Sequence, residues 1–273
     1  MSEPTPEHTN SAQVDDARYV EVDFDPFAGA AITAVIPTTE AQREVWLSDQ
    51  LDPVASLAYN ESVTIALRGS IDTEAMRTAI KALTQRHDVL RAVLSRDGTE
   101  LLIQQDAGQA LIVDDLSNLP EDEADATLTS LVAGESANAF DLVNGPLFRA
   151  RLISLTANEH ALVLGAHHIV CDGFSFAILI RDLAELYRNA VTGVLAALPP
   201  ADSFADYAAG LAAAQSQTDE PTEDELYWLE QFKRGLPAPL DLPTSRPRSA
   251  QRSFASARLD LSVKPELVRQ IRQ

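Results

Sequence analysis

The chain has 273 residues, of which 45% are hydrophobic and one is a cysteine, so it can bury a sizeable core but has no internal disulfide framework. It carries 41 acidic against 21 basic residues, a formal net charge of -20, which argues against nucleic acid and anionic membranes as partners. No apolar stretch is long enough to span a bilayer and the N-terminus lacks the pattern of a signal peptide, which together predict a cytoplasmic protein.

The first part of the chain predicts a leader and a linker before the folded region. Residues 1–18 are polar and acidic without a hydrophobic period, which is typical of a disordered leader, and residues 19–35 suit an extended linker. Thr38 and Thr39 then provide an N-cap for a short helix in EAQREVWLSDQL. We expect one domain to extend from here over residues 36–236.

Hydrophobic periods and turn signals predict the elements that follow. In chain order these are a strand in SVTIALRG; a helix capped by Asp72 or Thr73; two strands in DVLRAVLSRDGTELLIQQ joined at Asp97-Gly98; a strand in ALIVDD; a helix after Pro120; strands in LFRARLISL and HALVLGAHH; a helix in FSFAILIRDLAELYRNAV; and helices at 203–215 and 222–234. A Pro-rich connector is expected at 237–251, and a strand in SFASARLDLSV and a helix in KPELVRQIRQ begin a further part at 252–273.

The order of these elements predicts the fold class. Strands and helices mix without repeating, with hairpins as well as crossovers, and no Gly-rich phosphate loop follows a strand. This favours a mixed α/β layered sandwich over a doubly wound parallel sheet.

The stretch VLGAHHIVCDGFS contains the most informative polar residues of the chain. Successive side chains of a strand point to opposite faces, so His167 and His168 cannot both face one pocket while the strand stays regular. This argues against a metal site, for which Cys171 or Asp172 would have to supply further ligands. A lone Cys171 with a histidine close in sequence is also not the arrangement of a cysteine protease, so we interpret it as core filler. Trp46 and Trp228 are likewise expected to be core residues.

The remaining arrangement is a histidine at the end of a buried strand, on a turn held by Asp172 and relaxed by Gly173, with a helix directly after it. That arrangement suits acyl transfer, because a neutral imidazole can accept a proton from a nucleophile that attacks an ester or thioester. Amide N–H groups at the helix start could then stabilise the developing oxyanion. A buried aspartate should also find an arginine partner. From the residues alone, a purely structural histidine pair is an equally open interpretation.

The sequence resembles a known family, and the resemblance extends from about residue 36 to the end. HHIVCDG matches the His-His-x-x-x-Asp-Gly signature of condensation domains of nonribosomal peptide synthetases, which are related to chloramphenicol acetyltransferase. Further segments similar to the family follow in the same order: TEAQREVWL, RHDVLRAVL, FDLVNGPLFRARL, FADYAAGL and YWLEQFKRGLPAPLDLPTSRPR. The resemblance implies a chloramphenicol acetyltransferase-like mixed-sheet sandwich, present here as an N-terminal lobe with an incomplete second lobe.

The resemblance also implies roles for individual residues. His168 would be the active-site residue, acting as a base or orienting the attacking amine, and His167 would support the strand end. Gly173 would let backbone amides approach the thioester carbonyl. Asp172 would be structural and paired with an arginine, Arg86 first and Arg91 second.

The reaction implied by the resemblance is amide bond formation between an acyl or peptidyl thioester and an aminoacyl thioester. Both substrates would arrive on the phosphopantetheine arms of upstream and downstream carrier protein domains within a larger synthetase, and no cofactor would be bound by the chain itself. The segment RPRSAQR is a candidate basic patch for an acidic carrier.

Departures and alternatives remain open. Gly210 stands where the family usually has a tryptophan and Ser245 where aspartate is common. Because the chain ends at Gln273, soon after the second lobe begins, we expect weak or no turnover from it alone. The alternatives are a non-catalytic half-domain that binds a carrier protein or a missing partner lobe, and an epimerisation domain of the same superfamily.

Overall fold

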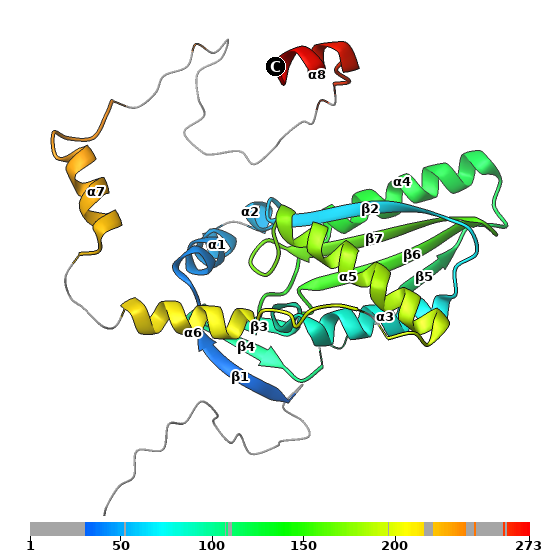
Figure 1. Ribbon diagram of the computed structural model, residues 1–273, viewed down its shortest axis with the longest axis horizontal. Helices are drawn as coiled ribbons and strands as arrows, with labels where there is room; N and C mark the ends of the chain where they lie inside the picture. Colours follow the sequence, from blue (N-terminus) through cyan, green and yellow to red (C-terminus); the bar gives the residue numbers. More distant parts are fainter. Residues whose placement is uncertain are drawn as a thin grey trace, which may run out of the picture. The chain divides into compact units, whose positions relative to one another are not determined.

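A four-stranded sheet forms the centre of the fold (Figure 1). Its strand order is β2 (Asn60–Arg68), β7 (Glu159–His167), β6 (Phe148–Thr156) and β5 (Ile112–Asp115); β5 pairs with β6 in parallel, and the other pairs are antiparallel. Alternation along β7 sends Leu162 and Leu164 to one face and Ala161 and Val163 to the other. Both faces of this strand are therefore buried, which explains its almost continuous apolar sequence.

Helices cover both faces of this sheet. Side chains of α3 (Thr73–Arg86) and α5 (Gly173–Thr192) belong to the larger core cluster with Leu162 and Leu164. Helix α4 (Glu121–Ala137) contributes to the smaller cluster on the opposite face, as Figure 1 also shows. The result is the layered α/β arrangement that the order of elements predicts.

A smaller antiparallel sheet completes this region, in the order β1 (Ile32–Pro37), β4 (Glu100–Gln104) and β3 (Ala92–Leu94). The remaining elements here are α1 (Glu40–Leu51), α2 (Pro53–Leu57), a 3-10 helix η1 (Asp88–Arg91) and α6 (Phe204–Gln215). Helices α7 (Glu223–Phe232) and α8 (Pro265–Ile271) belong to the second of two units, Met1–Glu220 and Pro221–Gln273.

The structure is a computed structural model that describes residues 31–51, 53–106, 108, 111–195, 197–215, 221–238, 243, 259 and 261–273. The leader expected at 1–18 lies outside these residues. The linker expected at 19–35, the connector at 237–251 and the strand expected in SFASARLDLSV lie largely outside them.

Most predicted elements are present, with two differences. The segment Asp88–Arg91 was expected to begin a strand but forms the 3-10 helix η1, because the strand pairs with β4 only from Ala92 onward. The end of the expected linker is also part of a strand, since β1 begins at Ile32 and pairs with β4. Aspartate 72 caps α3 by accepting hydrogen bonds from the backbone N–H groups of Glu74 and Ala75, as the sequence predicts.

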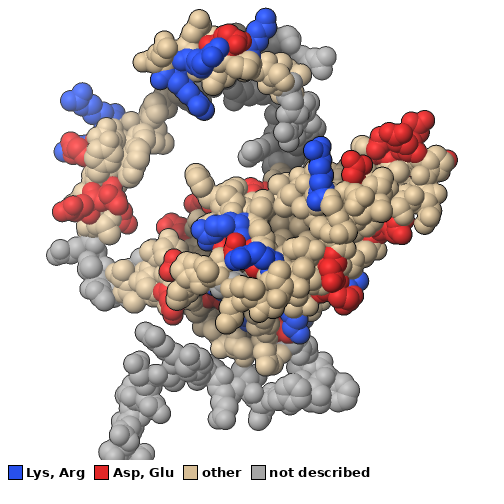
Figure 2. Space-filling model, turned by 45° about the vertical axis from the view of Figure 1, so that its right-hand side comes forward, with Lys and Arg blue, Asp and Glu red and all other residues tan. Residues whose placement is uncertain are grey.

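The surface reflects the acidic composition. Figure 2 shows acidic side chains over much of the visible face, with several gathered where the molecule projects at the upper right. One acidic group in the sequence is the first turn of α4, which contains Glu121, Asp122 and Glu123. Negative charge in the first turn of a helix is favourable because it opposes the positive end of the helix dipole. Among the described residues, no helix combines the length and apolar character needed to cross a membrane.

Candidate active site

The candidate site lies where β7 ends and α5 begins. We call residues 167–173, HHIVCDG, the site loop. After His167 the chain turns, with the N–H of Val170 donating to the carbonyl of His167 at 3.0 Å, and α5 starts at Gly173. The loop thus joins the most buried strand of the sheet to one of the helices that cover it.

His167 supports the strand end from inside the core. Its side chain has no exposed surface, its Nδ1 accepts a hydrogen bond from the N–H of Ile169 at 3.2 Å, and its ring packs edge-on against Phe140. Burial lowers the pKa of His167 to about 4, so the ring is neutral at neutral pH. Its Nε2 is buried without a partner among the described residues. These features fit a supporting role for His167 and not that of a base exposed to substrate.

His168 has the opposite orientation and is accessible. Its side chain is 40% exposed, and its N–H donates to the carbonyl of Tyr59 at 2.8 Å, which fixes the backbone beside the start of β2. The ring Nδ1 lies 3.0 Å from the carbonyl oxygen of Cys171 and 3.1 Å from Oε1 of Glu61. Within the part of the chain that the structure describes, Nε2 of His168 makes no hydrogen bond.

Gln42, on α1, holds the middle of the site loop. Its side chain is buried, and its Nε2 donates to the carbonyl of Ile169 at 3.0 Å. The other end of the same amide accepts from the N–H of Thr39 at 3.1 Å, while Thr39 Oγ1 accepts from the N–H of Gln42 at 3.3 Å. This reciprocal pair caps α1 and places the amide that ties the helix to the site loop.

Cys171 is buried within the larger core cluster. Burial raises the pKa of its thiol to about 12, which keeps the sulfur protonated and unreactive at neutral pH. The interpretation of this residue as core filler is confirmed.

Asp172 caps α5. Its Oδ1 accepts from the N–H of Ser175 at 2.8 Å and from Ser175 Oγ at 2.7 Å, and Ser175 Oγ in turn accepts from the N–H of Asp172 at 3.2 Å. These bonds, chiefly that from the Ser175 side chain, lower the pKa of Asp172. At Gly173, by contrast, an added Cβ would meet nothing within 4 Å, so the chain leaves open space beside the helix start.

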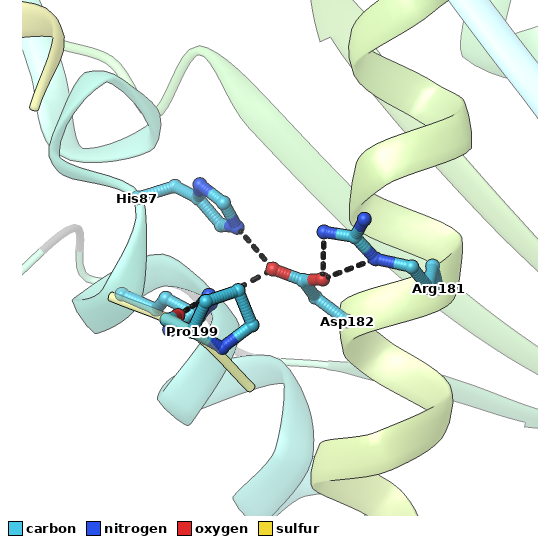
Figure 3. Close-up of polar contacts among 5 residues, drawn as sticks. His87, Arg181, Asp182 and Pro199 are labelled. Atoms are coloured by element: carbon cyan, nitrogen blue, oxygen red, sulfur yellow. Dashed lines mark hydrogen bonds and ion pairs between the residues drawn. The ribbon is translucent and has the colours of Figure 1, made fainter. Parts of the chain in front are cut away.

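The expected ion pair between Asp172 and Arg86 or Arg91 is wrong. Arg86 Nε donates instead to Oδ2 of Asp182 at 2.8 Å, and its Nη2 donates to the carbonyl of Pro199 (Figure 3). Arg91 donates to the backbone carbonyls of Thr84, at 3.0 Å from its Nε, and Gln104.

The geometry of α5 explains why Arg86 pairs with Asp182 and not with Asp172. Asp172 is the N-cap of α5, whereas Asp182 lies about 15 Å further along the helix axis, on the side that packs against α3. Arg86 is in the last turn of α3 and meets Asp182 there. An exposed aspartate at a helix N-cap needs no arginine, because helix N–H groups already stabilise its charge.

One backbone amide at the start of α5 has a partner within the chain. The N–H of Ser175 is already used by Asp172, so it is not available to a substrate carbonyl.

Sequence reasoning missed two residues that contact the site loop, Gln42 and Glu61. Gln42 stands in the quoted TEAQREVWL segment, but its contact with Ile169 spans more than a hundred residues and depends on tertiary packing. Glu61 precedes the expected strand in SVTIALRG, and only the antiparallel register of β2 with β7 places it beside the site loop. No three or more His, Cys, Asp or Glu side chains of the described residues are grouped to hold a metal ion.

Comparison with known proteins identifies relatives that match most of this chain. The family model for the condensation domain matches residues 32–273. The chain is 38% identical over 242 residues to phosphinothricin tripeptide synthetase PhsC from Streptomyces viridochromogenes, covering 87% of this chain and 22% of that protein. It is 37% identical over 237 residues to malpibaldin synthetase from Mortierella alpina, covering 82% of this chain and 4% of that protein.

Solved structures agree with the fold. The starter condensation domain of rhizomide synthetase RzmA superposes with a TM-score of 0.65 at 23% identity, covering 73% of this chain and 48% of that one. The first condensation domain of the calcium-dependent antibiotic synthetase superposes with a TM-score of 0.60 at 25% identity, covering 74% and 48%. The chain therefore spans about half of each solved domain. The predicted chloramphenicol acetyltransferase-like fold and the resemblance in sequence are both confirmed, and the chain belongs to the condensation domain family of nonribosomal peptide synthetases.

Proposed function

We propose that this chain contributes the histidine-bearing half of a condensation domain that forms an amide bond between two thioester-linked substrates. The donor is an acyl or peptidyl thioester and the acceptor is the amine of an aminoacyl thioester. The observation that carries the proposal is His168, whose ring is accessible and held at Nδ1 while Nε2 makes no hydrogen bond with a described residue.

The proposed reaction requires the site to orient the acceptor amine and to take up one proton. The acceptor nitrogen attacks the donor carbonyl carbon, a C–N bond forms, and the C–S bond breaks to release the donor's thiol. The nitrogen must lose one proton and the departing sulfur must gain one. The Nε2 lone pair of a neutral His168 can accept that proton, or a hydrogen bond from the amine that orients it.

The substrates reach such a site on long arms. We infer that upstream and downstream carrier protein domains deliver them on phosphopantetheine, and that adjacent domains of a larger synthetase hold these carriers in place. The curated relatives, of which this chain spans 22% and 4%, support such a context. Tethering supports the rate by raising the effective concentration of both reactants.

The test is amide formation, detected by mass spectrometry, from two loaded carrier proteins mixed with the chain. We expect product that is lost with His168→Ala and retained with Glu159→Ala, an exposed position at the far end of the same strand. Product that persists at full rate without His168 would overturn the assigned role. Carrier binding without product from the wild-type chain would instead support the non-catalytic half-domain.

A further inference from the structure

Glu61 lies beside His168 because of how two strands pair. In the antiparallel register of β2 and β7, Asn60 is opposite His167 and Glu61 is opposite Ala166, so β2 begins where β7 ends. From this position Oε1 of Glu61 reaches Nδ1 of His168 at 3.1 Å. The contact joins an edge strand to the site loop.

The contacts at Nδ1 specify where the hydrogen of the neutral ring lies. The carbonyl oxygen of Cys171, 3.0 Å from Nδ1, can only accept a hydrogen bond. The ionised carboxylate of Glu61 can also only accept. Because the Cys171 carbonyl is the hydrogen-bond partner of Nδ1, this nitrogen must carry the hydrogen of the neutral ring, and the lone pair is then on Nε2. The Glu61 carboxylate, within ion-pair distance of the same nitrogen, favours a hydrogen at Nδ1 electrostatically.

Three other groups near the His168 ring, those of Asp172, His167 and Tyr59, do not accept a hydrogen bond from its Nδ1. The carboxylate of Asp172 is engaged by the N–H and the hydroxyl of Ser175. His167 uses its own Nδ1 to accept from Ile169. Tyr59 stacks against His168, with ring centroids 6.4 Å apart, and supplies a face but no acceptor at Nδ1.

We propose that Glu61 is a positioning residue for His168. Together with the Cys171 carbonyl it holds the imidazole in the Nδ1–H form and in one orientation, which leaves the Nε2 lone pair free for the acceptor amine. The inference rests on the proposed function for its catalytic meaning, but its structural claim can be tested without turnover. Free histidine in water favours the opposite, Nε2–H form, so the protein must impose the one proposed here.

Nitrogen-15 NMR of the histidine-labelled chain measures this directly, because protonated and unprotonated ring nitrogens have well-separated chemical shifts. The chain has five histidines, and the His168 signals are assigned by their loss in His168→Asn. At a pH where this ring is neutral, we expect Nδ1 to have the shift of a protonated nitrogen and Nε2 that of an unprotonated one. In Glu61→Ala both shifts should move toward the average of the two forms.

The controls separate this role from a general loss of structure. Glu159→Ala changes the same residue type at the other end of the same strand pair, where Glu159 is opposite Arg68, and should leave the His168 shifts unchanged. Glu61→Met keeps the length of the side chain but removes its carboxylate, and should behave as Glu61→Ala does. Unchanged signals from the other histidines show that each variant is folded.

Two results would overturn the proposal. The first is an Nε2–H form of His168 in the wild-type chain, and the second is an unchanged His168 form in both Glu61 variants. In the amide-forming assay, the proposal further predicts a loss of about tenfold in kcat with little change in KM for Glu61→Ala. If the chain makes no product, the proposed function of the isolated chain fails while the NMR result still decides the role of Glu61.

Discussion

Asp182 holds a negative charge inside the interface between α3 and α5. Its side chain has no exposed surface, and it accepts hydrogen bonds from Arg86, Arg181 and His87 (Figure 3). Burial alone would raise the pKa of Asp182, but the hydrogen bonds from these three residues outweigh it and lower the pKa. Because Arg86 also binds the carbonyl of Pro199, one carboxylate connects α3, α5 and the segment before α6.

We expect Asp182→Asn to lower the free energy of unfolding at pH 7 by about 3 kcal/mol, because Arg86 would be left without its charged partner. A carboxyl whose pKa is lowered by folding adds stability above its unfolded pKa of about 4 and loses it as the pH falls through the folded pKa. The difference in free energy of unfolding between Asp182→Asn and the wild type should therefore shrink toward pH 3. Urea unfolding at both pH values measures this.

Asp106→Asn is the matched control, since Asp106 is exposed and its nearest cation, on Lys81, is 4.0 Å away. It should change stability by less than about 0.5 kcal/mol. An equally small effect of Asp182→Asn at pH 7 would contradict the importance of the buried network.

Cys171 allows a second prediction at the residue scale. Its thiol is buried and its pKa is raised to about 12, so the native chain should react very slowly with a thiol reagent at pH 8. Unfolding in urea should restore the ordinary rate. Because the chain has one cysteine, a single absorbance trace reports the result, and rapid native labelling would show that the site loop opens readily.

Contacts between elements fix the site loop more than the loop's own residues do. Gln42 links α1 to the carbonyl of Ile169, and Trp46, one turn later on α1, lies against Gly98 in the turn between β3 and β4. The expectation that Trp46 belongs to the core is confirmed by its packing on the larger core cluster. Trp228, on α7 of the second unit, stacks on Phe232 of the same helix and is 58% exposed, so its expected place in a core stays a prediction.

We expect Gln42→Ala to cost about 2 kcal/mol, since it removes a helix cap and leaves the buried carbonyl of Ile169 without its donor. Thermal unfolding measures the loss, and faster amide hydrogen exchange at residues 169–171 should accompany it. Gln50→Ala, an exposed position on the same helix, should be close to neutral. A loss of stability in Gln42→Ala without faster amide hydrogen exchange in the site loop would contradict the proposed link between α1 and that loop.

Gly98→Ala tests the contact between α1 and the hairpin. Gly98 has a φ of 71°, and an added Cβ would lie 2.2 Å from the Trp46 ring. Gly193 has the same φ of 71° with nothing within 4 Å of an added Cβ, so Gly193→Ala isolates the backbone strain, about 1 kcal/mol. We expect Gly98→Ala to cost about 3 kcal/mol, the excess arising from displacement of Trp46. If urea unfolding gives equal losses of free energy for Gly98→Ala and Gly193→Ala, the Trp46 ring moves aside without an energetic cost.

At the scale of the whole molecule, the imbalance of 41 acidic and 21 basic residues dominates. Among the described residues, most ion pairs on the surface are exposed i,i+3 pairs, such as Arg77–Glu74 on α3 and Arg269–Glu266 on α8, which add little stability. Repulsion among the excess carboxylates should therefore oppose folding at neutral pH and low ionic strength.

Raising the salt concentration screens this repulsion, so we expect Tm at pH 7 to rise by a few degrees between about 10 mM and 150 mM NaCl. Calorimetry or circular dichroism at the two concentrations measures the change. Sodium sulfate at the same ionic strength controls for specific chloride binding. A fall in Tm would mean that favourable ion pairs, and not repulsion, dominate the electrostatic energy.

The sequence by itself determined the class of fold, most helices and strands, and the position of the site loop. Those features depend on local patterns: alternation in β7, the aspartate caps of α3 and α5, and the Asp-Gly turn before β4. It also gave His168 and His167 their different surroundings, since neighbouring residues at a strand end face opposite ways.

Only the tertiary structure decided which side chains meet across the chain. Arg86 pairs with Asp182 because α3 packs on the middle of α5, and Glu61 reaches His168 because β2 starts beside the end of β7. No local pattern encodes a helix contact or a strand register between segments about a hundred residues apart. Tertiary packing therefore determines which polar groups surround the site loop, whereas local sequence patterns determine the loop itself and the histidine that it carries.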